Sequence, residues 1–92
     1  MRTAKDMDTN TVIQTLKTLL ATKLPSNRAA ETIDDDEPLM EGGLNLDSIG
    51  IVELIGLVES EFAFQFDDTD LRTATFENVR SLADVIANRL NA

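Results

Sequence analysis

Apolar side chains recur at the spacing of an α-helix in three stretches of this sequence, and this pattern restricts the chain to a helical fold. The stretches cover residues 11–24, about 48–62, and 79–90, and each places an apolar stripe along one side of a helix. Thr11 with Gln14 matches a capping box for the first helix, and Asn78 can cap the last one. The sequence therefore predicts three main helices around one thin core.

The segments between these helices contain no pair of strands. Phe62, Phe64 and Phe66 alternate as in a strand, but three positions without a partner do not make a sheet, so we interpret them as a connector that plugs the core. Residues 67–72 are expected to form one short helical turn begun by an Asp cap. Residues 26–43 read as a long polar loop. Four apolar side chains should pin this loop to the core at intervals: Ile33, Leu39, Met40 and Leu44.

These elements predict an all-α fold, a four-helix bundle with three main helices, one short helix and a long first loop. We expect one domain over residues 1–92, in which residues 1–8 are a flexible N-terminal arm. The first ten residues hold no apolar run, and Glu53 interrupts the longest apolar stretch. Neither a signal peptide nor a membrane span is therefore expected, which favours a cytoplasmic protein. Five side chains from the second and last helices should meet in the core: Leu54, Val58, Phe62, Leu82 and Ile86.

The second predicted helix has apolar residues on two sides. At about 100° per residue, one broad arc faces the core, and it contains Gly50, Ile51, Leu54, Ile55, Leu57, Val58 and Phe62. Ile49, Val52 and Gly56 lie on the opposite side, among Glu53 and Glu59. A second apolar strip in so small a protein should be exposed and open to a partner. The alternative is that scattered surface aliphatic residues have no function.

The formal net charge of −9 is concentrated in the middle of the chain, where residues 29–71 contain thirteen acidic residues and no basic one. This segment should attract basic proteins and repel nucleic acid and anionic membranes, so neither of the latter is expected as a ligand. The alternative is that acidity only maintains solubility. The acidic runs 34–37 and 67–70 are interpreted as solvated loops without metal, because an EF-hand counted from Asp68 would put Arg72 and Val79 at ligand positions.

Cysteine and histidine are both absent. Their absence excludes disulfides, thiolate nucleophiles, imidazole bases and most zinc sites. Lys5, Lys17 and Lys23 lie in the first quarter of the chain, away from any serine motif that a lysine base could serve. We therefore expect no catalytic residues, no metal site and no enzymatic activity. Any reactive group has to come from outside the chain.

Ser48 lies in the first turn of the second predicted helix, directly after Asp47 and the glycine-containing loop 42–46. Free N–H groups and the positive end of the helix dipole would stabilise a phosphoester at this position. A serine in front of an apolar run also fits a plain helix cap. From the residues alone, both interpretations stay open.

The segment 43–54, Gly-Leu-Asn-Leu-Asp-Ser-Ile-Gly-Ile-Val-Glu-Leu, resembles the attachment segment of acyl, peptidyl and D-alanyl carrier proteins. The similarity extends over nearly the whole chain. It implies that Ser48 receives 4′-phosphopantetheine from coenzyme A through a phosphopantetheinyl transferase, and that Asp47 supports this modification and its Mg²⁺. It also implies a monomeric, stand-alone carrier that presents a thioester-linked acyl or aminoacyl group to loading ligases or synthases. The arm would supply the thiol that the chain lacks.

The same resemblance implies that partners dock on the exposed strip of the second helix, through Ile49, Val52, Glu53 and Glu59. Gly56 lies on this strip as well. The chief alternative is an acidic interaction module that docks a basic partner without being modified.

Three positions depart from the pattern of the family. Ile49 replaces the usual Leu, and Gly50 stands where fatty-acid carriers often have an acidic residue. The string Leu-Asp-Ser-Ile-Gly at residues 46–50 is more similar to D-alanyl carriers and to carriers of specialised biosynthesis. Ala63 replaces a common helix-ending glycine, so the exit from the second helix is expected to differ. Fatty acyl, polyketide, lipopeptide and aminoacyl cargoes all stay compatible with the sequence.

Overall fold

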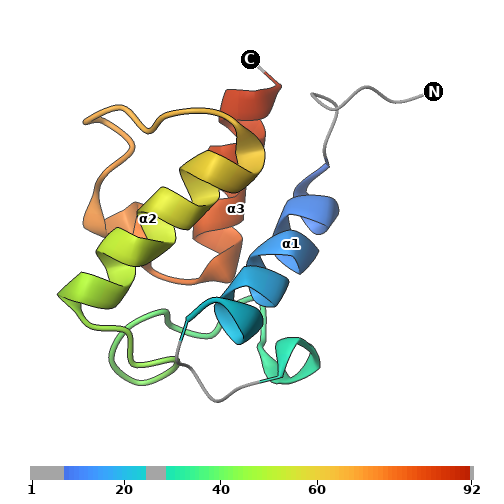
Figure 1. Cartoon of the computed structure of the whole chain (residues 1–92), viewed down its shortest axis with the longest axis vertical. Coiled ribbons are helices and arrows are strands. Elements are labelled where there is room, and N and C mark those ends of the chain that lie inside the picture. The colour runs from blue at the N-terminus through green and yellow to red at the C-terminus, as the bar shows by residue number, and fades with distance from the viewer. Residues whose placement is uncertain (1–7, 25–28, 92) are drawn as a thin grey trace.

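The computed structural model describes residues 8–24 and 29–91, and it forms a bundle of helices (Figure 1). The elements are α1 (Thr9–Thr22), η1 (Ala30–Thr32), α2 (Ser48–Phe62), η2 (Thr73–Phe76) and α3 (Val79–Leu90), where η marks a 3-10 helix. α1 packs mainly against α3, and α2 runs at an angle across the bundle (Figure 1). Within the described residues the only β-type pairing is an isolated bridge between Pro38 and Asn78. The predicted all-α fold is confirmed.

α2 has the predicted bounds and the predicted inward face. Gly50, Leu54, Val58 and Phe62 are buried, while Ile51, Ile55 and Leu57 are partly buried against the core. The five side chains expected to meet in the core belong to one cluster. The period of apolar residues was therefore sufficient to orient this helix.

α1 begins two residues earlier than predicted. The Asp8 carboxylate accepts a hydrogen bond from the Thr11 backbone N–H at 2.8 Å, so Asp8 caps the helix and Thr11 lies inside it. The predicted capping box of Thr11 and Gln14 is wrong, because a carboxylate earlier in the chain already satisfies a free N–H of the first turn. Asp8 was placed in the N-terminal arm, and the rest of that arm, residues 1–7, lies outside the described residues.

The connector after α2 differs from the prediction in where its short helix lies. Residues 68–70 form only a turn, and the short helix is η2, Thr73–Phe76, which buries Thr75 and Phe76. The Asp67 and Asp70 carboxylates bind the Arg89 guanidinium of α3 instead of starting a helix. Phe64 and Phe66 pack against the core as expected, with ring centroids 4.9 Å apart.

The long loop is pinned to the core at three of the four predicted positions. Ile33, Leu39 and Leu44 are buried, whereas Met40 is 38% exposed. Met40 lies outside the core because the chain reverses there: the Asn45 N–H donates to the Met40 carbonyl at 2.8 Å. The expectation for Met40 is therefore wrong.

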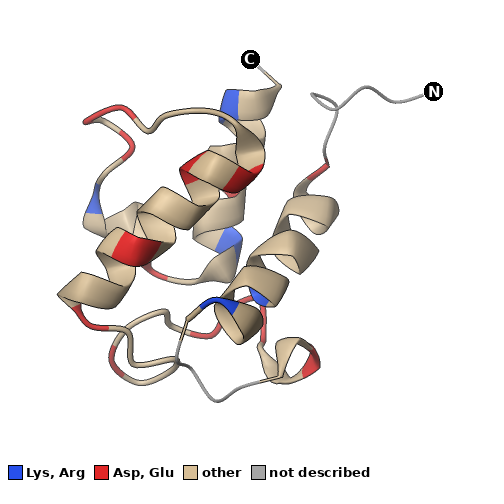
Figure 2. Ribbon diagram, in the orientation of Figure 1, with Lys and Arg blue, Asp and Glu red and all other residues tan. Residues whose placement is uncertain are grey.

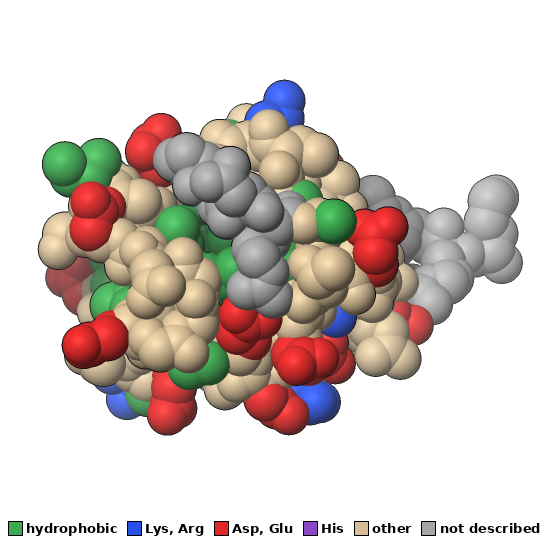
Figure 3. Space-filling model, turned by 90° about the horizontal axis from the view of Figure 1, so that it is seen from below, with side chains coloured by type: hydrophobic (Ala, Val, Ile, Leu, Met, Phe, Trp, Pro, Cys, Tyr) green, Lys and Arg blue, Asp and Glu red, His purple; other side chains and the backbone are tan. Residues whose placement is uncertain are grey.

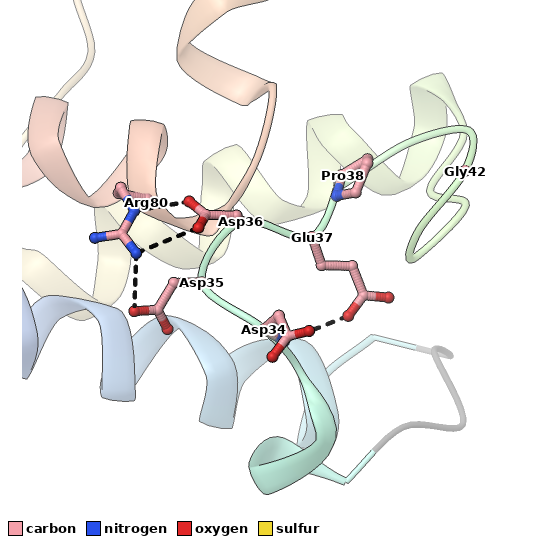
Figure 4. A pocket seen from close by; sticks show the side chains of 7 residues that line it. All are labelled: Asp34, Asp35, Asp36, Glu37, Pro38, Gly42 and Arg80. Carbon is pink, nitrogen blue, oxygen red and sulfur yellow. Dashed lines mark hydrogen bonds and ion pairs between the residues drawn. The ribbon is translucent and has the colours of Figure 1, made fainter.

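The acidic run at residues 34–37 is not simply solvated. Asp35 forms an ion pair with Lys17 of α1 at 2.6 Å and a longer one with Arg80 of α3, and the Asp36 carboxylate accepts from Arg80 Nε at 2.7 Å (Figure 4). This hydrogen bond lowers the pKa of Asp36. The run is exposed at Asp34 and Asp36 as predicted, and the ion pairs were not foreseen because these cations lie far from the run in sequence but beside it in the bundle.

Candidate functional site

At the start of α2, Asp47 caps the helix and Ser48 is left exposed with a free side chain among the described residues. The Asp47 carboxylate accepts from the Gly50 backbone N–H at 2.8 Å, which makes Asp47 the N-cap. Ser48 is the first helical residue and is exposed, and its hydroxyl makes no hydrogen bond to the parts of the chain that the structure describes. The plain cap interpretation of Ser48 is therefore wrong, since Asp47 already performs that role.

The loop before Ser48 is held in a defined shape by its own backbone. The Leu44 N–H donates to the Pro38 carbonyl at 2.9 Å, and the Leu46 N–H donates to the Leu39 carbonyl at 2.9 Å. Gly43 is required for this close approach, because a Cβ built there would lie 2.1 Å from the Pro38 carbonyl oxygen. Asn45 has a left-handed backbone with φ of 59°, which Asn tolerates better than most residues. The glycine and asparagine were the sequence signals of this turn.

A shallow hollow of about 330 Å³ lies beside the start of α2. It is bounded by the turn at residues 44–46, by the cap Asp47, and by Ile49, Gly50 and Glu53 of the first turns of the helix. A group attached to the Ser48 hydroxyl would thus leave the helix end next to a partly apolar surface.

The predicted docking strip is exposed at its first members. Ile49 is 71% exposed and Val52 is 66% exposed, and Glu53 is exposed beside them. Gly56 is exposed as well, and a Cβ built on it would meet nothing within 4 Å. Figure 2 shows acidic residues but no basic ones along α2. The structure thus brings Ile49, Val52 and Gly56 onto a surface that is open and negatively charged.

Glu59 has a different environment from Glu53. Its carboxylate accepts a hydrogen bond from the Phe66 backbone N–H at 2.9 Å, and the residue is half-buried. This bond fixes the connector after α2 against the helix. Sequence reasoning missed this role, because the spacing of residues does not show where the connector returns.

The end of α2 keeps the shape that a glycine would give it. Ala63 has left-handed backbone angles, φ 56° and ψ 51°, and the Phe64 N–H reaches back to the Glu59 carbonyl at 3.3 Å. This 6→1 backbone hydrogen bond, which joins residues five positions apart, is typical of the Schellman motif at a helix C-terminus. The residue departs from the family pattern, but the expected difference in the exit from the helix is not observed.

A comparison with protein families identifies the chain. The family described as "phosphopantetheine attachment site" matches residues 14–86. This chain belongs to the acyl carrier protein family. A curated acyl carrier protein from Coprothermobacter proteolyticus is 31% identical over 88 residues, which cover 91% of this chain and 96% of that protein. Covalently attached phosphopantetheine is the prosthetic group of this family, and acyl carrier proteins are carriers rather than enzymes.

A solved structure supports the same assignment. The solution NMR structure of a holo acyl carrier protein from Nitrosomonas europaea superposes with a TM-score of 0.76 and 26% identity, and the match covers 87% of this chain and 96% of that one. The four-helix carrier architecture predicted from the sequence is therefore confirmed, with η2 as its short helix.

The residues at the start of α2 fit such a prosthetic group. The Ser48 hydroxyl is exposed and unengaged among the described residues, and the first turn of a helix of 15 residues favours a phosphate. The parts of the chain that the structure describes hold no cluster of three or more metal-ligating side chains. They also contain no helix long and apolar enough to cross a bilayer.

Proposed function

We propose that Ser48 carries 4′-phosphopantetheine and that the chain delivers a thioester-linked acyl or aminoacyl group to partner biosynthetic enzymes. The observation that carries this proposal is the free hydroxyl of Ser48 at the start of α2, next to a residue that already caps the helix. When bound, the arm supplies a thiol to a chain without cysteine.

The chain contributes a nucleophile and a fixed position to the modification. The step forms a bond between Ser48 Oγ and the phosphorus of the arm, and it breaks the bond from that phosphorus to the nucleotide part of coenzyme A. The proton of the hydroxyl is released. Free N–H groups of the first turn then face the new phosphoester. Asp47 directly precedes Ser48 in the chain, and its carboxylate is held by the cap bond to Gly50; its proposed role is to support the Mg²⁺ of the transferase.

Intact mass tests the attachment site. Incubated with coenzyme A, Mg²⁺ and a phosphopantetheinyl transferase of broad specificity, the wild-type chain should gain one phosphopantetheinyl group and Ser48→Ala none. Ser60→Ala is the matched control, because Ser60 is exposed on the same helix and its loss should leave the modification intact. A folded Ser48→Ala chain that is still modified would exclude Ser48. A wild type that several transferases leave unmodified would favour the unmodified interaction module.

We also propose that the exposed strip of Ile49, Val52 and Gly56, with Glu53 at its edge, docks partner enzymes. Exposure of two large aliphatic side chains beside a carboxylate without an ion pair among the described residues supports a partner that is apolar at its centre and basic at its rim. Glu59 lies on the same side of α2 and is proposed as a docking residue too, while its bond to the Phe66 N–H holds the connector. Glu53→Lys should slow the modification more at low than at moderate ionic strength, and an unchanged rate at both would remove Glu53 from the docking face.

A further inference from the structure

A second apolar hollow lies away from the α2 strip. It has a volume of about 550 Å³ and runs between the start of the loop turn and η2. We call it the loop groove; it is lined by Pro38, Met40, Glu41, Thr73, Ala74, Phe76 and Glu77.

The walls of the loop groove are joined by hydrogen bonds, so its shape exists before any partner arrives. The Leu39 N–H donates to the Glu77 carbonyl at 3.1 Å, and Pro38 pairs with Asn78 in the isolated bridge. Leu39 and Phe76 belong to the core below. A preformed apolar hollow costs little reorganisation when it is filled.

The carboxylates at the loop groove are uncompensated. The Glu41 and Glu77 side chains are exposed and make no hydrogen bond or ion pair within the described residues. The neighbouring hollow of about 750 Å³ at residues 34–38 differs, because there Arg80 binds Asp35 and Asp36 (Figure 4). Figure 3 shows acidic side chains around apolar ones on the lower face of the molecule. The loop groove therefore favours a basic partner that inserts an apolar side chain.

The loop groove lies close to Ser48. Met40 is joined to Asn45 by a backbone hydrogen bond of 2.8 Å, and the three residues from Asn45 to Ser48 span at most about 11 Å. A standard interface covers roughly 800 Å² on each partner, which corresponds to a round patch with a radius of about 16 Å. An enzyme that reacts with the Ser48 hydroxyl itself has to make contact around it, so a contact of this size can extend to Met40 at the near edge of the loop groove.

We propose that the loop groove is a second docking point for the phosphopantetheinyl transferase, which inserts an apolar side chain between Met40 and Phe76 and places a basic residue against Glu41 and Glu77. The inference rests on the proposed attachment at Ser48 and adds a surface to it. Enzymes that act at the far end of the arm can stand farther from Ser48 and need not cover the loop groove.

Steady-state modification of the apo chain tests this surface. Met40→Ser and Glu41→Lys should each lower kcat/KM about fivefold, mainly through KM, as expected for the loss of one apolar or one charged contact within the interface. Met40→Leu should stay within about twofold because it keeps the apolar wall. Glu61→Lys is the charge-matched control: Glu61 is exposed and lies thirteen residues after Ser48 on α2, or roughly 20 Å along the helix. The kcat/KM of Glu61→Lys should therefore also stay within about twofold of wild type.

The outcomes separate the two proposals. If the wild type is modified normally and Met40→Ser and Glu41→Lys react at the same rate, docking in the loop groove is refuted while attachment at Ser48 still holds. If the wild type is not modified at all, both proposals are refuted. The Met40 methyl resonance gives a second measurement that does not depend on turnover. A shift when transferase is added to the apo chain without coenzyme A supports docking in the loop groove. If the resonance shifts in the modified chain without transferase but not in the apo chain with transferase, the arm itself fills the loop groove and the proposal is refuted.

Discussion

Ala63→Gly should make the chain more stable. Ala63 ends α2 with φ of 56° and is exposed, so the substitution removes no buried contact. Left-handed helical angles cost a residue with a Cβ roughly 1–2 kcal/mol. Glycine avoids that cost but gives the unfolded chain more freedom, which offsets about 0.4–1 kcal/mol. The midpoints of these two ranges give a net gain of about 0.8 kcal/mol, or a rise in Tm of about 3–6 °C for a domain of this size.

Thermal unfolding followed by far-UV circular dichroism measures this gain, with urea unfolding as an independent check. Ala21→Gly is the matched control, because Ala21 lies within the right-handed turns of α1, where glycine costs up to about 1 kcal/mol. The two variants make the same chemical change and should shift Tm in opposite directions. A lower Tm for Ala63→Gly would refute the argument that backbone strain is stored at the end of α2.

Three further results are expected. Gly43→Ala should destabilise the chain by about 1–3 kcal/mol in urea unfolding, because its Cβ would press on the Pro38 carbonyl oxygen. Phe62→Ala should be barely folded by circular dichroism, since truncating a buried Phe costs about 3–5 kcal/mol and small domains have about 5–15 kcal/mol in total. Asp36→Asn should be less stable than wild type at neutral pH. That difference should begin to shrink in acid unfolding near the ordinary Asp pKa of about 4 and vanish only at lower pH, because Arg80 lowers the folded-state pKa of Asp36 and its stabilisation is lost as pH falls through that lowered value.

Each of these expectations has a contradicting outcome. Equal urea midpoints for Gly43→Ala and wild type would mean that the loop can widen without cost. A Phe62→Ala chain that melts within about two degrees of wild type would contradict the inward placement of that ring. A stability difference for Asp36→Asn that persists at all pH values would show that its cause is not the ionised carboxylate.

The sequence was sufficient for features that depend on residues close together in the chain. The bounds of α2 follow from the apolar period over residues 48–62. The cap of α3 was equally local, since Asn78 and Ser81 satisfy each other's backbone N–H groups. The position of Ser48 at the start of a helix was therefore predictable from its neighbours.

The features that were missed depend on contacts between distant segments. The Asp36 carboxylate meets Arg80 across 44 positions of sequence, and Glu59 meets a backbone N–H that only the folded connector brings near. η2 has no apolar period of its own to reveal it, because a helix of four residues is held by packing rather than by propensity. At α1 the capping-box pattern of Thr11 and Gln14 indicated the wrong start, because Asp8 caps the helix.

The separation of charge between the helices has a consequence for how this protein meets its partners. α2 carries three acidic and no basic residues, whereas α1 carries one basic and no acidic residue and α3 two basic and one acidic (Figure 2). Among the three main helices, α2 is therefore the one with a net negative charge. A partner with a basic surface is attracted to such a helix while it is still diffusing, so we expect basic enzymes to meet the chain more often at the helix that starts with Ser48 than at α1 or α3.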